Sequence, residues 1–296
     1  MDSFRFVCDV CCLVNVNVSI RFSILGAGKD QMQMIQIPKI IHYCWFGSEE
    51  PDFVRKNVAN WRLMCPEFEI KKWDNSNFDV NCDPYVADAA SLGQWAFVSD
   101  VARLMAISQK GGIYLDTDVI LKKNLSELIE DVESTNSSAF FALEFPGRAN
   151  TGLGFGGTKG NKVIDDILST YTNRRFRDNG GKRIKITTVD IVSDYLHRLG
   201  LNLSGKKQIL SASEDESVLI LPTTCFPNSF GAKKKDLQSV HVIGIHENHG
   251  SWKNNQSGLH HLISLHVIKL KMVTRLFLDK LFGYGTYDRL KQILNF

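Results

Sequence analysis

Two aspartates, Asp116 and Asp118, stand two residues apart in the largely apolar segment from Ile113 to Leu121. The alternation of side chains along a strand predicts that Tyr114, Asp116 and Asp118 share one face, with the two carboxylates roughly 7 Å apart. Carboxylates on a strand that is otherwise buried are costly unless a cation or a hydrogen-bonded partner neutralises them. Oxygen ligands favour Mg²⁺ or Mn²⁺, which keep substrate phosphate oxygens among their remaining ligands. The segment therefore predicts a divalent metal site.

A second pair of charges precedes this segment. Asp100 and Arg103 lie three residues apart in Gln94–Lys110, whose apolar residues recur at helical spacing, so the two side chains share one helix face. A structural ion pair accounts for such a pair in isolation. Next to an acidic strand, the same pair has the chemistry to accept hydrogen bonds from a sugar ring and to donate them to a pyrophosphate.

Three motif blocks together carry a resemblance to a known family. The blocks are Ile37–Gly47 (IPKIIHYCWFG), the run AFVSDVAR that ends at Arg103, and the run GGIYLDTD that ends at Asp118. In this order they resemble the Asp-x-Asp sugar transferases, which include yeast-type initiating mannosyltransferases and bacterial capsular polysaccharide transferases. The resemblance implies a GT-A type nucleotide-sugar-binding fold with a Rossmann-like mixed sheet, and a Mn²⁺ or Mg²⁺ cofactor.

The resemblance also implies roles for single residues. Trp45 is expected to stack on the base of the donor, Tyr114 to contact the donor, and Asp100 and Arg103 to bind its sugar and phosphates. Asp116 is expected to contact the ribose and the metal, and Asp118 to ligate the metal directly. Both aromatic residues are also compatible with a place in the hydrophobic core.

A polar block after a late strand completes the expected site. It runs from His246 to Trp252 and reads HENHGSW. His246 is expected to be a metal ligand because it ends the strand, and Ser251 and Trp252 to cap the diphosphate of the donor. A surface histidine in a polar loop is the alternative interpretation of His246.

The implied activity is metal-dependent transfer of a sugar, with retention of configuration, from a nucleotide-sugar donor. A UDP-sugar is the favoured donor, and a glycan or lipid-linked oligosaccharide is the expected acceptor, as in capsular or surface polysaccharide synthesis. Two alternatives stay open: a non-catalytic nucleotide-sugar-binding relative, and a glycoside hydrolase that uses Asp116 and Asp118 as paired carboxylates.

The elements that must position these residues alternate between strands and helices. The pattern predicts a strand within 37–47, a helix over 51–64 and a strand over 68–73, and the β–α–β order favours parallel pairing. Further strands are expected over 113–121, 140–145 and 240–245, and a helix over 161–171. The glycine-rich run 152–157 is interpreted as a close approach of the backbone to the donor or acceptor. The fold class predicted is therefore α/β, with C-terminal helical additions.

Length and composition fit one enlarged globular domain. The chain has 296 residues, of which 44% are hydrophobic and 23% charged, and we expect a transferase domain over 35–258 followed by a helical segment over 259–296. Residues 1–34 show no regular pattern and are expected to be a disordered extension or a misassigned start.

Charge and cysteine content bear on partners and location. A formal net charge of +3 is too weak a field to indicate nucleic-acid binding. Seven cysteines at unrelated spacings favour a reducing, cytoplasmic location. The expected helix over 262–282 holds four basic residues against one acid, so it either packs on the core or contacts the cytoplasmic face of a membrane as a basic amphipathic helix.

Overall fold

The computed structural model describes residues 36–172, 174–178, 180–184, 186–229, 234–248 and 258–294. Residues 258–266, 268–269 and 292 are described by their backbone alone. The expected N-terminal extension, residues 1–34, lies outside the described residues, as do Ser251 and Trp252.

The central element is a mixed sheet, which confirms the predicted α/β class. In the described part of the chain its strands follow the order β2-β1-β3-β7-β5-β9-β8, and β6 pairs with β5. The bounds of these strands are β1 (Ile40–Cys44), β2 (Glu69–Trp73), β3 (Gly112–Tyr114), β5 (Ala139–Phe145), β6 (Arg148–Ala149), β7 (Phe155–Gly157), β8 (Gln208–Ser211) and β9 (Ser217–Leu221). Strand β1 runs parallel to β2 and β3, as the β–α–β order predicts, whereas β7 is antiparallel to both of its neighbours.

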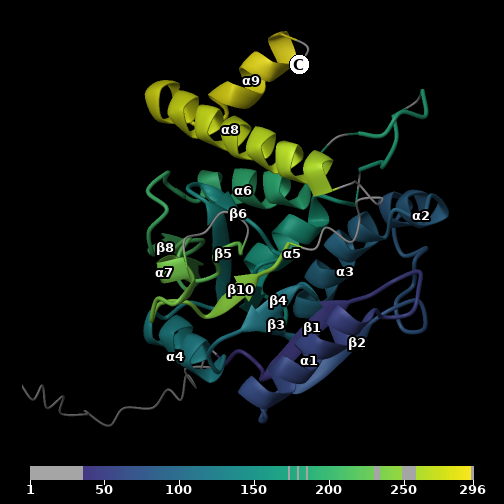
Figure 1. The fold of residues 1–296 in the computed structure, drawn as a ribbon, viewed down its shortest axis with the longest axis vertical. Coiled ribbons are helices and arrows are strands. Elements are labelled where there is room, and N and C mark those ends of the chain that lie inside the picture. The colour runs from purple at the N-terminus through teal and green to yellow at the C-terminus, as the bar shows by residue number, and fades with distance from the viewer. Residues whose placement is uncertain are drawn as a thin grey trace, which may run out of the picture. The chain divides into compact units, whose positions relative to one another are not determined.

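Helices cover both faces of this sheet (Figure 1). On one face, α3 (Trp95–Lys110), α5 (Lys162–Ser169) and α6 (Thr188–Arg198) pack with α2 (Pro84–Ser91) over Tyr114, Phe141 and Phe155. On the other face, α1 (Asp52–Met64) and α4 (Ser126–Ser134) pack over Ile41, Ile113 and Phe140. Because adjacent residues of a strand point to opposite faces, these strands are apolar on both sides and the sheet is the buried middle layer.

A second, two-stranded sheet lies beside the main one. Strand β4 (Val119–Leu121) pairs antiparallel with β10 (Gly244–His246), and His246 lies opposite Val119. The prediction of one strand over 113–121 is therefore wrong: β3 and β4 belong to different sheets, and residues 115–118 form the turn between them. The strand expected over 240–245 is also shorter and later, because residues 239–242 form a turn closed by Val242 N–H donating to the Ser239 carbonyl.

The chain continues into two helices, α8 (Gly258–Phe282) and α9 (Thr286–Ile293), after the short α7 (Lys234–Leu237). Asp288 of α9 pairs with Arg275 of α8 through two hydrogen bonds of 2.7 and 2.8 Å. Tyr284 donates a hydrogen bond to Asp194 and stacks on His197, both in α6. These contacts confirm the expected C-terminal helical additions. None of the helices among the described residues is long and apolar enough to cross a membrane.

Candidate active site

Arg103 of α3 stands between two carboxylates. Its Nη2 lies 3.3 Å from Oδ1 of Asp100 on the same helix and 3.3 Å from Oδ1 of Asp116. The guanidinium also lies 4.8 Å from the centre of the Tyr114 ring, and the Tyr114 hydroxyl donates to Asp116 over 3.0 Å. The helical pair predicted from sequence thus forms, and it extends to the first aspartate of the motif.

Arg103 is buried, and the protein satisfies most of its donors. Nε donates to the Ser99 carbonyl over 3.1 Å, and Nη1 contacts the Thr151 hydroxyl at 3.4 Å. Burial alone would lower the pKa of Arg103. The negative charges of the neighbouring carboxylates outweigh this effect, so the net shift of the pKa is upward. A buried cation with this many partners holds a fixed position, which suits it to orient a ligand.

Asp100 occupies a drier environment than Asp116. Burial raises the pKa of Asp100 to about 6, while Arg103 and a hydrogen bond with Thr188 act in the opposite direction. Burial likewise raises the pKa of Tyr114 well above its ordinary value, so its hydroxyl remains a proton donor at neutral pH.

The turn between β3 and β4 is held by backbone hydrogen bonds and by side chains of α1. Asp116 N–H donates to the Gly152 carbonyl over 2.9 Å, and Leu115 N–H donates to the His42 carbonyl over 3.1 Å. Side chains of α1 bind the other half: Asn57 donates to the Thr117 carbonyl and Trp61 to the Val119 carbonyl. These bonds satisfy backbone carbonyls that a continuous strand would pair within the sheet, which explains how the chain leaves one sheet and enters the next.

His246 reaches the second aspartate through the β4–β10 pairing. Its Nε2 lies 3.0 Å from Oδ1 of Asp118, and Glu247 N–H donates to the Asp118 carbonyl. Burial lowers the pKa of His246, but the hydrogen bond and charge of Asp118 outweigh it, and the net shift is upward. His246 therefore lies beside the second aspartate of the motif, and its role as a metal ligand stays a prediction.

Asp116, Asp118 and His246 together form a group with metal-binding chemistry. One ligand atom from each of the three lies within 4.8 Å of the others. Nδ1 of His246 is buried and finds no hydrogen-bond partner among the described residues, so the ring is not fixed by a second bond on that side. Two carboxylates and an imidazole fit Mn²⁺ or Mg²⁺, and the donor set therefore suits the expected cofactor.

Trp45 lies at the same edge of the main sheet as Asp116. It directly follows β1, whose His42 pairs in register with Tyr114 of β3. Its indole Nε1 donates to the carbonyls of Ser48 and Glu49, and its ring packs edge-on against Phe53. The side chain is half-buried, so part of it faces solvent at this edge.

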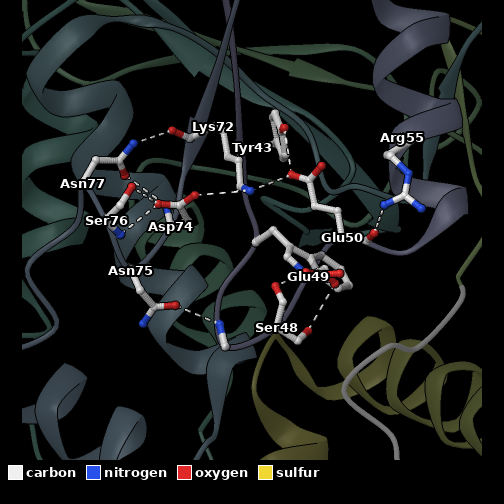
Figure 2. Close-up of polar contacts among 12 residues, drawn as sticks. Tyr43, Ser48, Glu49, Glu50, Arg55, Lys72, Asp74, Asn75, Ser76 and Asn77 are labelled. Carbon is white, nitrogen blue, oxygen red and sulfur yellow. Dashed lines mark hydrogen bonds and ion pairs between the residues drawn. The ribbon is translucent and has the colours of Figure 1, made fainter.

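The loop that follows Trp45 is braced against the loop after β2 (Figure 2). Glu50 accepts a hydrogen bond from Tyr43 over 3.0 Å and an ion pair from Lys72 at 3.1 Å. Gly47 N–H donates to the Asn75 side chain over 2.9 Å. A braced loop gives Trp45 a defined position, and its stacking on the donor base stays a prediction.

Several residues at the site were missed in the sequence interpretation. Asn57 carried a usable signal, because it is a polar residue on the apolar face of the helix over 51–64. Gly152 lay in the glycine-rich run, and the reason for glycine is now specific: a Cβ there would lie 2.0 Å from Oδ2 of Asp116. Thr151, the contact of Arg103, carried no signal of its own. The structure thus shows Gly152 close to the first aspartate of the motif, and the approach of 152–157 to the donor or acceptor stays a prediction.

Comparison with known proteins places this geometry in a class. Residues 51–135, which contain α1, α3 and the two aspartates, match the family described as the glycosyltransferase sugar-binding region containing the DXD motif. Residues 51–135 are therefore similar to the sugar-binding region of the DXD glycosyltransferases.

Individual relatives are distant. An uncharacterised glycosyltransferase, L373, of Acanthamoeba polyphaga mimivirus is 34% identical over 100 residues, which cover 31% of this chain and 40% of the relative. The chain thus matches less than half the length of this curated relative.

Solved structures give matches of lower identity. The PaToxG glycosyltransferase is 18% identical, with 55% of this chain and 69% of that chain covered and a TM-score of 0.43. A glycosyltransferase involved in glycosylation of the PBCV-1 major capsid is 15% identical, with 73% of this chain and 95% of that chain covered and a TM-score of 0.41. The galactosyltransferase LgtC, in complex with donor and acceptor sugar analogs, is 12% identical, with 77% of this chain and 95% of that chain covered and a TM-score of 0.39.

Proposed function

We propose that this chain is a metal-dependent glycosyltransferase of the GT-A type that moves a sugar from a nucleotide-sugar donor to a glycan or lipid-linked oligosaccharide. The observation that carries the proposal is the continuous path of contacts from the Asp116, Asp118 and His246 group to Arg103 and Asp100. A diphosphate on the first group would place its sugar against the second. A UDP-sugar is the donor that we propose to test first, and surface polysaccharide synthesis is the role that we propose for it.

Asp116, Asp118 and His246 would hold Mn²⁺ or Mg²⁺ in this scheme. The bound cation supplies electrostatic stabilisation of the diphosphate as the glycosidic bond breaks. Asp116 has a second task, because its contacts with Arg103 and Tyr114 keep the carboxylate aligned between the metal group and the sugar-binding side chains.

Arg103 and Asp100 would bind the transferred sugar and the adjacent phosphate. The fixed guanidinium favours the developing negative charge on the leaving phosphate without having to reorganise. Asp100 accepts hydrogen bonds from sugar hydroxyls when it is ionised. We propose transfer with retention of configuration, in which the departing phosphate accepts the proton of the acceptor hydroxyl.

The two alternative functions make different use of the same residues. Glycoside hydrolysis needs carboxylates on opposite sides of a sugar. Asp116 and Asp118 instead converge, together with His246, on one point, which favours a shared cation. A non-catalytic binding protein would keep this geometry, so turnover separates it from a transferase.

Calorimetric titration with UDP and with GDP, with and without Mn²⁺, tests the proposal. We expect UDP binding that Mn²⁺ strengthens and that Asp118→Asn weakens by about a hundredfold or more. Asp131→Asn is the matched control, because Asp131 pairs with Lys207 on the surface. Equal binding by Asp118→Asn would refute the metal site, and binding without turnover of any UDP-sugar would support the binding protein instead.

We also propose that α8 rests on the cytoplasmic face of an anionic membrane, where a lipid-linked acceptor would be found. Its exposed apolar residues recur every three or four positions along one side, namely Val267, Leu270, Val273, Phe277 and Leu281. Exposed Lys271 and Lys280 border that side, whereas Arg275 and Asp279 face α9. An apolar face flanked by lysines is typical of helices that lie in a lipid interface.

Vesicle flotation tests the membrane contact. Leu270 and Phe277 are 68% and 62% exposed, so Leu270→Glu/Phe277→Glu should leave folding intact. We expect this variant to lose binding to phosphatidylglycerol-containing vesicles. The control is Leu63→Glu/Val240→Glu, which alters residues that are as exposed but lie elsewhere. Equal flotation of the two variants would contradict the proposal.

A further inference from the structure

The segment between α5 and α6 is a basic hairpin. Arg177 and Arg183 form an antiparallel bridge, Ile184 N–H donates to the Phe176 carbonyl, and Asp178 N–H donates to the Lys182 carbonyl. Figure 1 shows the segment extending from the helices that flank it. We name residues 174–178 and 180–184 the basic hairpin. Its basic residues are Arg174, Arg175, Arg177, Lys182 and Arg183, against Asp178 as the only acid.

The charge of the hairpin faces solvent. Arg175, Arg177 and Lys182 are exposed, and none of them forms an ion pair with another described residue. The carboxylate of Asp178 accepts hydrogen bonds from the backbone of Gly180 and Lys182 within the turn. Because the one acid is engaged by the backbone of the turn, Arg175, Arg177 and Lys182 remain available to a ligand from outside the chain.

The base of the hairpin is fixed next to Asp100. Phe176 is buried and packs edge-on against Phe97 of α3, with ring centres 5.0 Å apart, and the guanidinium of Arg183 lies 4.3 Å from the centre of the Phe97 ring. Phe97 precedes Asp100 by three residues, so the two side chains lie on the same helix face. The hairpin therefore begins one helical turn from Asp100.

The order of contacts indicates what the hairpin binds. The path runs from Asp118 and Asp116 through Arg103 to Asp100, and then to Phe97 and the hairpin. If the diphosphate occupies the start of this path and the transferred sugar lies at Arg103 and Asp100, the next group along it is the acceptor. This step rests on the proposed function. Arginines bind phosphate, sulfate and carboxylate oxygens through paired hydrogen bonds.

We infer that the basic hairpin is the binding site for an anionic acceptor, a glycan that carries phosphate, sulfate or carboxylate groups near the sugar that is extended. The hairpin adds affinity and steers the acceptor toward Asp100 by its positive field. A neutral glycan of equal length binds more weakly, and added salt removes the difference because exposed charges are screened.

Binding by the full chain loaded with Mn²⁺ and UDP tests this site. The probes are a sulfated, uronic-acid-containing tetrasaccharide and neutral maltotetraose. We expect the charged probe to bind more tightly, and Arg175→Gln/Arg177→Gln to weaken it by about fivefold, as the loss of two exposed ion pairs predicts. The control Lys56→Gln/Arg62→Gln removes the same charge from exposed positions on α1 and should leave both probes unaffected.

The outcomes of this experiment distinguish a failure of the acceptor site from a failure of the proposed function. Equal affinity for the two probes, with metal-dependent UDP binding intact, would overturn the acceptor site and leave the proposed function standing. Loss of UDP affinity in Arg175→Gln/Arg177→Gln would assign the hairpin to the donor. Weaker flotation of this variant on anionic vesicles, or weaker binding of a single-stranded RNA, with no change for the charged tetrasaccharide would assign it to a membrane or to nucleic acid.

Discussion

Arg103 of α3 and the exposed arginines of the basic hairpin differ in solvation, although α3 and the hairpin both contribute to the same hydrophobic cluster. Arg103 is 7% exposed, contacts two carboxylates and an aromatic ring, and has almost no freedom. Arg175 and Arg177 are exposed and have no ion-pair partner among the residues described. The two regions place positive charge on the same side of the sheet in different states of solvation.

This difference in solvation distinguishes a charge that fixes the position of its neighbours from a charge that attracts a ligand. A buried charge with close partners of opposite charge fixes the geometry around it, because moving it would leave those charges without partners. An exposed charge contributes a field that salt weakens and that tolerates small movements. Changes in the buried group should therefore affect stability and donor binding together, whereas changes in the hairpin should affect neither.

Replacing the buried arginine is expected to have the largest effect. Arg103→Met leaves Asp100 and Asp116 without their shared cation, and we expect the free energy of unfolding to fall by about 3–5 kcal/mol. Denaturant unfolding followed by circular dichroism measures it. Adding Asp100→Asn should restore part of the loss, since it removes one orphaned carboxylate. Arg55→Met is the control, because Arg55 is exposed. A loss no larger than that of the control would show that the buried network is not structural.

Crowding Asp116 should impair the donor site. Gly152→Ala places a methyl group 2.0 Å from Oδ2 of Asp116, so the carboxylate must move. We expect the affinity for UDP with Mn²⁺ to fall by about tenfold to a hundredfold, as displacements of this size in binding groups do. Titration calorimetry gives the value, with Gly180→Ala in the basic hairpin for comparison. Unchanged affinity would mean that Asp116 does not act on the donor.

Lowering the pH should weaken metal binding. The pKa of His246 is raised, since Asp118 outweighs the effect of burial, and only the neutral imidazole ligates a metal. Below this pKa, we expect the affinity for Mn²⁺ to fall by up to about tenfold per pH unit. In the absence of metal, fold stability depends on pH in the opposite direction. The His246–Asp118 pair stabilises the fold below pH 6.5, and this contribution is lost as the pH rises through the raised pKa of His246. His246→Asn should flatten both dependences. If His246→Asn and the unmodified protein showed the same pH dependence of Mn²⁺ affinity and of stability, His246 would be excluded from the site.

Substituting one exposed arginine of the hairpin should have the smallest effect on the fold. For Arg177→Gln we expect a change within about 0.5 kcal/mol in the free energy of unfolding, as for most surface positions. Thermal melting at low and high salt is the measurement. A loss of several kcal/mol would show that the hairpin is a structural element and would remove the contrast with Arg103.

The elements that carry most of the site were predictable from local patterns. The helices over 51–64 and 94–110 show apolar residues at helical spacing, and the structure has α1 and α3 there. The pairing of Asp100 with Arg103 followed from the same periodicity. Local rules suffice in these cases because each contact lies within about one turn of a helix.

The division of residues 113–121 between two sheets was beyond such rules. Side chains alternate in the same way along one strand and along two short strands joined by a turn, so alternation does not distinguish them. The turn is set by distant groups, including the His42 carbonyl and the side chains of Asn57 and Trp61. The contact between Arg103 and Asp116 likewise depends on how α3 packs over β3. Tertiary contacts of this kind leave no periodic trace in a single sequence.

The separation of Asp118 from His246 along the chain has a consequence for the order of folding. The two residues meet only when β10 pairs with β4, and between them the chain forms much of the main sheet and the helices that cover it. Contacts that close such long loops form late, because the entropy of closure must first be offset by other contacts. During synthesis, the motif at Asp116 and Asp118 leaves the ribosome long before its histidine partner. The complete metal-binding group is thus expected to arise only after the rest of the sheet has assembled.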